Sequence, residues 1–147
     1  MNNSEKTSVI VVDDDNMIRE MLKLILSSEG DWQNIQRPGR NRVMCRVIGE
    51  TSNGQDAIAL CARLKPGLVL LDINMPKMDG LQALEEIRKI SPATVVLMVS
   101  AEATMDKVRE AILKGADGFV VKPFNPASVL DKIAMCLERK GQKWQTS

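Results

Sequence analysis

The sequence contains no histidine and no tyrosine, and only two tryptophans and two phenylalanines among its 147 residues. The absence of histidine excludes Ser-His-Asp and Cys-His nucleophile pairs, histidine-bearing zinc sites and phosphohistidine carriers. The patterns GxGxxG and GxxxxGK[ST] are also absent, so neither dinucleotide binding nor P-loop chemistry is indicated. Any chemistry must therefore rest on carboxylates, lysine, hydroxyl groups and a metal ion.

The chain also lacks a strong net charge and a long apolar run. Its net charge of +1 provides no overall field for nucleic acid or an anionic membrane, and no run approaches the ~20 apolar residues of a membrane span. Residues 1–7 are polar and have no signal-peptide core. Three widely spaced cysteines, Cys45, Cys61 and Cys136, are typical of reduced thiols. We expect a cytoplasmic protein without direct binding to nucleic acid or membrane.

The most informative stretch begins with four apolar residues, Leu68–Leu71, which predict a strand buried on both faces. Asp72 follows at once, and Pro76 and Gly80 then exclude a continuous helix or strand. Asp72 is therefore expected where a buried strand gives way to a loop. Taken alone, such an aspartate is as consistent with a simple turn or cap as with a functional site.

Strand-like and helix-like patterns alternate five times along one domain. This alternation predicts a five-stranded parallel sheet with helices on both faces. Strands are predicted over 8–12, 43–49, 68–71, 95–99 and 118–121. Helices are predicted over 16–28, from a possible capping box at Ser52-x-x-Gln55 to Leu64, from Gly80 to Ser91, from Met105 to Gly115, and from Pro126 to Arg139.

Outside these elements we expect a disordered N-terminus over residues 1–7, a domain over 8–140, and a frayed tail over 141–147. Residues 30–42 have no apolar period, and we interpret them as an insertion at the edge of the sheet opposite Asp72. Its Trp32, Arg37, Arg40 and Arg42 are typical of interfaces, although a passive surface loop is the simpler alternative.

Polar residues follow four of the buried strands. Asp13 and Asp14 follow the first, Asp72 the third, Ser100 the fourth and Lys122 the fifth. Each is common in turns or on surfaces, but the carboxyl ends of parallel strands share one edge, so all five can converge. Three adjacent carboxylates repel unless a cation joins them, and oxygen ligands suit Mg²⁺. Carboxylate, Mg²⁺, lysine and hydroxyl are the parts needed for phosphoryl transfer to an aspartate.

The motifs at these strand ends resemble those of the receiver domains of two-component response regulators. The resemblance rests on Val11–Asp15, Leu71–Gly80, Val99–Ala101 and Gly118–Phe124, and covers about residues 8–139. It implies a doubly wound, flavodoxin-like α/β fold with strand order 2-1-3-4-5.

The resemblance also implies roles for particular residues. Asp72 would be the phosphoacceptor, and Lys122 would pair with the phosphoryl group. Mg²⁺ would be held by Asp13, Asp14, Asp72 and the backbone carbonyl of Asn74. These assignments identify a phosphoaspartate signalling switch with slow self-dephosphorylation, rather than a metabolic enzyme.

Other implied roles concern switching and dephosphorylation. Ser100 would hydrogen-bond a phosphoryl oxygen, and Phe119 would be the aromatic switch that swings inward as Ser100 moves. Because the switch residue is phenylalanine, no switch hydroxyl is available. Asn74 and Glu102 would tune dephosphorylation, and the Lys122-Pro123 bond would be cis.

The expected phosphoryl donor is a phosphohistidine on a sensor histidine kinase or a histidine phosphotransfer protein. We expect the signal to leave by contact with a downstream protein, either as in chemotaxis or within a relay. Two alternatives remain. A Mg²⁺-dependent phosphatase usually needs an acid two positions after its nucleophile, where this chain has Asn74. A receiver-like scaffold would bind partners without phosphorylation, which the complete set of site residues argues against.

Overall fold

A computed structural model describes residues 6–27, 33, 36–40 and 42–146, with side chains described as far as residue 140. The predicted disorder of residues 1–5 and the predicted role of Trp32 lie outside the described residues. The elements are β1 (Thr7–Val12), α1 (Asn16–Leu26), β2 (Cys45–Thr51), α3 (Gly54–Leu64), β3 (Leu68–Leu71), α4 (Gly80–Ile90), β4 (Val95–Ser100), α5 (Met105–Leu113), β5 (Gly118–Val121) and α6 (Pro126–Thr146).

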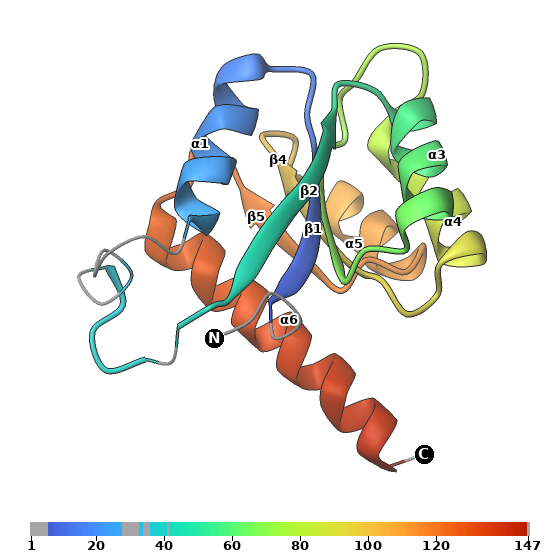
Figure 1. The fold of residues 1–147 in the computed structure, drawn as a ribbon. Helices are drawn as coiled ribbons and strands as arrows, with labels where there is room; N and C mark the ends of the chain where they lie inside the picture. Colours follow the sequence, from blue (N-terminus) through green and yellow to red (C-terminus); the bar gives the residue numbers. More distant parts are fainter. Residues whose placement is uncertain (1–5, 28–32, 34–35, 41, 147) are drawn as a thin grey trace.

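The five strands form one parallel sheet in the order β2-β1-β3-β4-β5. This order confirms the predicted flavodoxin-like fold. Helices α1 and α6 cover one face, and α3, α4 and α5 cover the other (Figure 1). β2 is an edge strand, and Arg46 in it is exposed.

The apolar run of each central strand serves both faces of the sheet. In β1, Val9 and Val11 face the core under α1 and α6, whereas Ile10 and Val12 face the core under α3 and α4. Alternate side chains of a strand point to opposite faces, so a strand covered on both sides must be apolar throughout. Among the described residues, none of the helices has the length and hydropathy that a bilayer crossing requires.

Several element boundaries differ from the prediction. Ser27 is extended, so α1 ends at Leu26. The cap of α3 is Asn53 rather than Ser52, because the Asn53 side chain accepts a hydrogen bond from the Asp56 amide. Helix α6 continues to Thr146 instead of ending near Arg139. The residues beyond Arg139 include good helix formers, and a single internal glycine costs only about 1 kcal/mol.

The insertion contains helical residues where no regular structure was predicted, at Gln33 and Gln36. The side chain of Gln33 is buried; its Nε2 donates to the Val43 carbonyl at 3.0 Å, and its Oε1 accepts from the Val43 amide at 2.8 Å. β2 starts at Cys45, the residue that pairs with Thr7 at the start of β1, and not at residue 43 as predicted.

A second contact ties the insertion to α6. The buried Arg37 guanidinium donates through Nε to an Asp131 carboxylate oxygen at 2.7 Å. Together with the Gln33 contacts, this places the described part of the insertion at the amino edge of the sheet, as predicted. Arg40 and Arg42 are exposed there. The described part of the insertion is therefore anchored to the domain by Gln33 and Arg37, and its role at an interface stays a prediction.

The Gln33 contacts predict that Gln33→Ala destabilises the protein. Loss of the side-chain amide leaves the buried amide and carbonyl of Val43 without these partners, which costs about 1–3 kcal/mol. Gln36→Ala is the matched control, because Gln36 is an exposed helical residue of the same segment and should cost less than about 0.5 kcal/mol. Urea unfolding of the two variants measures the difference, and equal free energies of unfolding would show that the Gln33 contacts contribute nothing.

Candidate functional site

Backbone hydrogen bonds between neighbouring strands continue for one residue beyond the ends of β1, β3 and β5. They fix the backbone at the start of the loops that carry Asp13, Asp72 and Lys122. The Asp72 amide donates to the Val12 carbonyl at 3.0 Å, and the Asp13 amide donates to the Thr51 carbonyl at 3.1 Å. The Lys122 amide likewise donates to the Ser100 carbonyl at 3.0 Å. The predicted residues at the strand ends are therefore held at one edge by the sheet itself.

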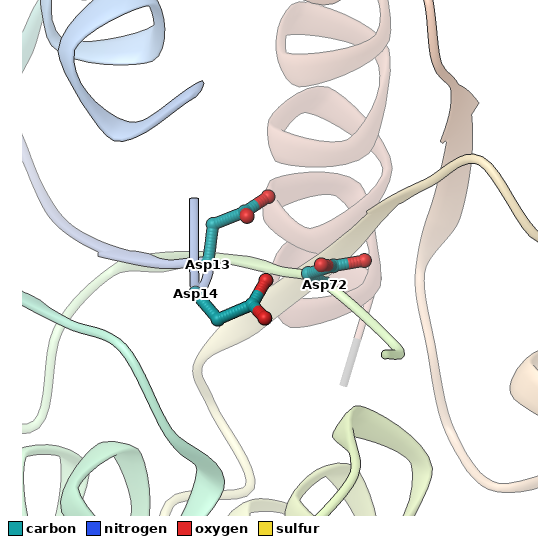
Figure 2. Close-up of side chains that lie close together, drawn as sticks. All are labelled: Asp13, Asp14 and Asp72. Atoms are coloured by element: carbon teal, nitrogen blue, oxygen red, sulfur yellow. The ribbon is translucent and has the colours of Figure 1, made fainter. Parts of the chain in front are cut away.

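Three carboxylates meet at this edge. One oxygen each from Asp13, Asp14 and Asp72 lie within 4.8 Å of one another (Figure 2). Asp13 and Asp72 are buried, whereas Asp14 is exposed. The acidic cluster, defined here as these three residues, therefore has an inner pair of carboxylates and one that faces solvent.

Lys122 provides the positive charge that lies against the inner pair. Its Nζ is 2.7 Å from Asp13 Oδ2 and 3.4 Å from Asp72 Oδ2, with 16% of the side chain exposed. Burial alone would lower the pKa of Lys122, but its interactions with Asp13 and Asp72 raise it overall. The lysine therefore stays charged at neutral pH.

One ammonium does not balance three carboxylates. Burial raises the pKa of Asp72, and the neighbouring Asp13 raises it further, against the opposing effect of Lys122. A cluster of oxygen ligands with excess negative charge and one exposed member fits a hard divalent cation such as Mg²⁺.

The loop after Asp72 returns tightly against the strand end. The Gly80 amide donates to the Ile73 carbonyl at 2.7 Å, and a Cβ placed on Gly80 would lie 1.9 Å from the Asp72 carbonyl oxygen. Only glycine fits there. Asp79 and Gln82 then close a capping box at the start of α4. The sequence indicated Gly80 as a helix breaker but not its close approach to Asp72.

The other predicted residues differ in burial and in their contacts. Ser100 is fully buried, and its Oγ accepts a hydrogen bond from the Glu102 amide at 3.1 Å. Phe119 is half-buried against the core under α3, α4 and α5. Asn74 is exposed, and Glu102 is half-buried with an oxygen 3.9 Å from Lys107 Nζ. The Lys122-Pro123 bond is cis, as expected.

One contact to the cluster was not predicted. Arg19, in α1, donates through Nη1 to the backbone carbonyl of Asp13 at 2.6 Å and through Nε to Glu50 at 2.9 Å. The sequence analysis used only the apolar face of this helix. A basic residue one turn after the Asp15 cap is a signal that could have indicated a contact back to the acidic loop.

Comparisons with known proteins agree with this geometry. Residues 9–134 match the response regulator receiver domain family. The chain is 38% identical over 125 residues to chemotaxis protein CheY of Thermotoga maritima, covering 85% of this chain and 92% of that protein. It is 33% identical over 130 residues to the nitrate/nitrite response regulator NarL of Escherichia coli, covering 88% of this chain but only 54% of that protein.

A solved structure is also similar. The CheX-CheY-BeF₃-Mg²⁺ complex of Borrelia burgdorferi matches with a TM-score of 0.77 and 29% identity, covering 92% of this chain and 93% of that chain. Receiver domains are signalling proteins rather than metabolic enzymes; they generally bind Mg²⁺ at an acidic cluster, are phosphorylated on an aspartate and interact with histidine kinases. The chain belongs to the receiver domains of two-component response regulators and is CheY-like.

Proposed function

We propose that this chain is a phosphoaspartate switch in which Asp72 accepts a phosphoryl group from a phosphohistidine partner. The observation that carries this proposal is the place of Asp72. It is a buried carboxylate at the end of a central strand, with Lys122 Nζ 3.4 Å from one of its oxygens and two further carboxylates beside it. Neither core packing nor a simple turn requires that arrangement.

In the proposed transfer, an Asp72 carboxylate oxygen attacks phosphorus while the phosphorus–nitrogen bond of the donor breaks. The imidazole nitrogen leaves, and an acyl phosphate remains on Asp72. Lys122 stands close enough to Asp72 to offset negative charge on the phosphoryl oxygens. A sensor histidine kinase or a histidine phosphotransfer protein would be the donor.

The residues that would hold Mg²⁺ are Asp13, Asp14, Asp72 and the backbone carbonyl of Asn74. When bound, the ion would neutralise charge on the phosphoryl oxygens. Asn74, two residues after Asp72, and Glu102, two residues after Ser100, would tune dephosphorylation; Asn74 is exposed and Glu102 is half-buried. A phosphatase would need a second acid at position 74, and we therefore favour the switch.

Output is proposed to run through Ser100 and Phe119. The Ser100 hydroxyl now accepts from the Glu102 amide, so a turn toward phosphoryl oxygens would release that amide and free space for the Phe119 ring. The signal would then pass to a downstream protein in the cytoplasm by contact with α5, β5 and α6. The similarity to a chemotaxis protein over 92% of that protein's length supports this mode of output.

Phosphorylation tests the proposal directly. Incubation with Mg²⁺ and acetyl phosphate should add one phosphoryl mass to the parent, and Asp72→Asn should abolish the addition. Asp79→Asn is the matched control, because Asp79 lies in the same loop and asparagine can also cap α4. Intact-protein mass spectrometry reads the result. Phosphorylation of Asp72→Asn at the parental rate would overturn the assignment.

The raised pKa of Asp72 predicts an effect on stability in the absence of Mg²⁺. The folded state binds this proton more tightly than the unfolded chain does, so ionisation of Asp72 destabilises the fold. The penalty is absent below the ordinary pKa of 3.8 and develops as pH rises through the raised pKa.

Metal-free Asp72→Asn should therefore melt at a higher temperature than the parent at pH 7, and the gap should narrow as pH falls toward 3.8. Added Mg²⁺ should stabilise the parent more than the variant, because a ligand stabilises the state that binds it. Calorimetric melting curves at several pH values measure both effects. A metal-free variant less stable than the parent at pH 7 would contradict the argument.

Ser100→Ala should separate phosphorylation from output. The variant keeps Asp72, Lys122 and the acidic cluster and should still be phosphorylated, but it lacks the hydroxyl that couples the site to Phe119. Amide chemical shifts measured with and without beryllium fluoride and Mg²⁺ provide the test. In the parent, amide resonances should shift around Phe119 and over residues 107–114. In the variant, the same resonances should shift much less. A full parental pattern in Ser100→Ala would show that Ser100 does not couple them.

A further inference from the structure

Arg19 links α1, the acidic loop and the end of β2. Its guanidinium donates to the Asp13 carbonyl at 2.6 Å, to a Glu50 oxygen at 2.9 Å and to the Asn16 side-chain oxygen at 2.9 Å. Only 14% of the side chain is exposed. Three directional hydrogen bonds from one planar guanidinium leave the side chain little conformational freedom. Arginine is well suited to such a role, because its donors are fixed in one plane.

The carbonyl that Arg19 holds belongs to the peptide between two members of the acidic cluster. Rotation of the Asp13–Asp14 peptide would move the exposed Asp14 carboxylate relative to the buried Asp13 carboxylate. The Asp13 side chain is already fixed, because Oδ2 accepts from Lys122 Nζ at 2.7 Å and Oδ1 accepts from the Asp15 amide at 2.9 Å. Arg19 fixes the carbonyl that follows.

Glu50 holds the far side of the guanidinium and balances its charge. It also binds Lys23, whose Nζ lies 2.6 Å from Glu50 Oε2 and 2.6 Å from a Glu20 oxygen. Arg19 is therefore part of a paired charge network anchored on β2 and α1. Lys23 belongs to the same network but contacts Glu20 and Glu50 rather than the Asp13 carbonyl, so it offers a matched comparison.

We propose that Arg19 is a positioning residue of the Mg²⁺ site, which holds the Asp13–Asp14 peptide in the orientation that brings the Asp13, Asp14 and Asp72 oxygens together. The inference rests on the proposed function, in which this cluster binds Mg²⁺. Arg19 would touch neither the ion nor the phosphoryl group. It acts through the backbone of a residue that does.

Two explanations of the role of Arg19 predict opposite changes in Mg²⁺ affinity when the residue is replaced. If Arg19 acted only as a nearby positive charge, its removal would reduce repulsion of the cation and strengthen Mg²⁺ binding. If Arg19 positions the acidic loop, Arg19→Gln should weaken binding although the site becomes more negative. Removal of groups that orient metal ligands typically costs about 10–100-fold in affinity.

The experiment is calorimetric titration of Mg²⁺ into the parent, Arg19→Gln, Arg19→Lys and Lys23→Gln. We expect the Kd to rise about tenfold in Arg19→Gln and by a smaller factor in Arg19→Lys, which keeps the charge but not the planar fork. Lys23→Gln should stay within about twofold of the parent or bind more tightly. Parental or tighter binding by folded Arg19→Gln would overturn the inference.

Melting curves with and without Mg²⁺ distinguish positioning from a purely structural role. A structural role would lower the melting temperature equally in both conditions, whereas positioning would shrink the Mg²⁺-induced rise. If Arg19→Gln does not fold, Arg19→Lys decides, and a parental Kd in that variant would overturn the inference. A parent that binds no Mg²⁺ would instead overturn the proposed function. The two failures are therefore separate outcomes of one data set.

Discussion

The site depends on like charges that the fold forces together. Asp13 and Asp72 are buried at the ends of adjacent strands, where the hydrogen bonds of the sheet fix both backbones. Neither carboxylate can retreat without loss of the core beneath it, and Lys122 offsets only part of their repulsion. The uncompensated negative charge favours binding of a cation, and a bound cation would in turn favour a phosphoryl group at the site.

The carboxyl and amino edges of the sheet carry different groups of residues. The carboxyl edge carries the acidic cluster, Lys122 and Ser100. At the amino edge, the described part of the insertion packs on α6 through Arg37 and Asp131. Helix α6 also packs on the core that contains Val9 and Val11 of β1 and Leu68 and Leu70 of β3. The same helix therefore contacts both the insertion and the strands that carry Asp13 and Asp72.

Most of the fold and the inner site could be predicted because their signals are local. Alternating patterns located the strands, and a polar residue after each apolar run located Asp13, Asp72, Ser100 and Lys122. Contacts from side chains to backbone groups were not predicted by these patterns. The Arg19 contact to the Asp13 carbonyl and the Gln33 contacts to Val43 depend on side-chain direction and packing, which periodicity does not encode. The cap at Asn53 was missed because Ser52 is equally suited by residue type.

The two hydrogen bonds between Gln33 and Val43 also bear on how this protein behaves in a crowded solution. β2 is an edge strand, and an edge strand with free amides and carbonyls can recruit a strand from another molecule. Gln33 takes up both backbone groups of Val43, just before the strand begins, and so shortens the length of edge open to such pairing. The Gln33 side chain would thus disfavour pairing with a second molecule at this one position.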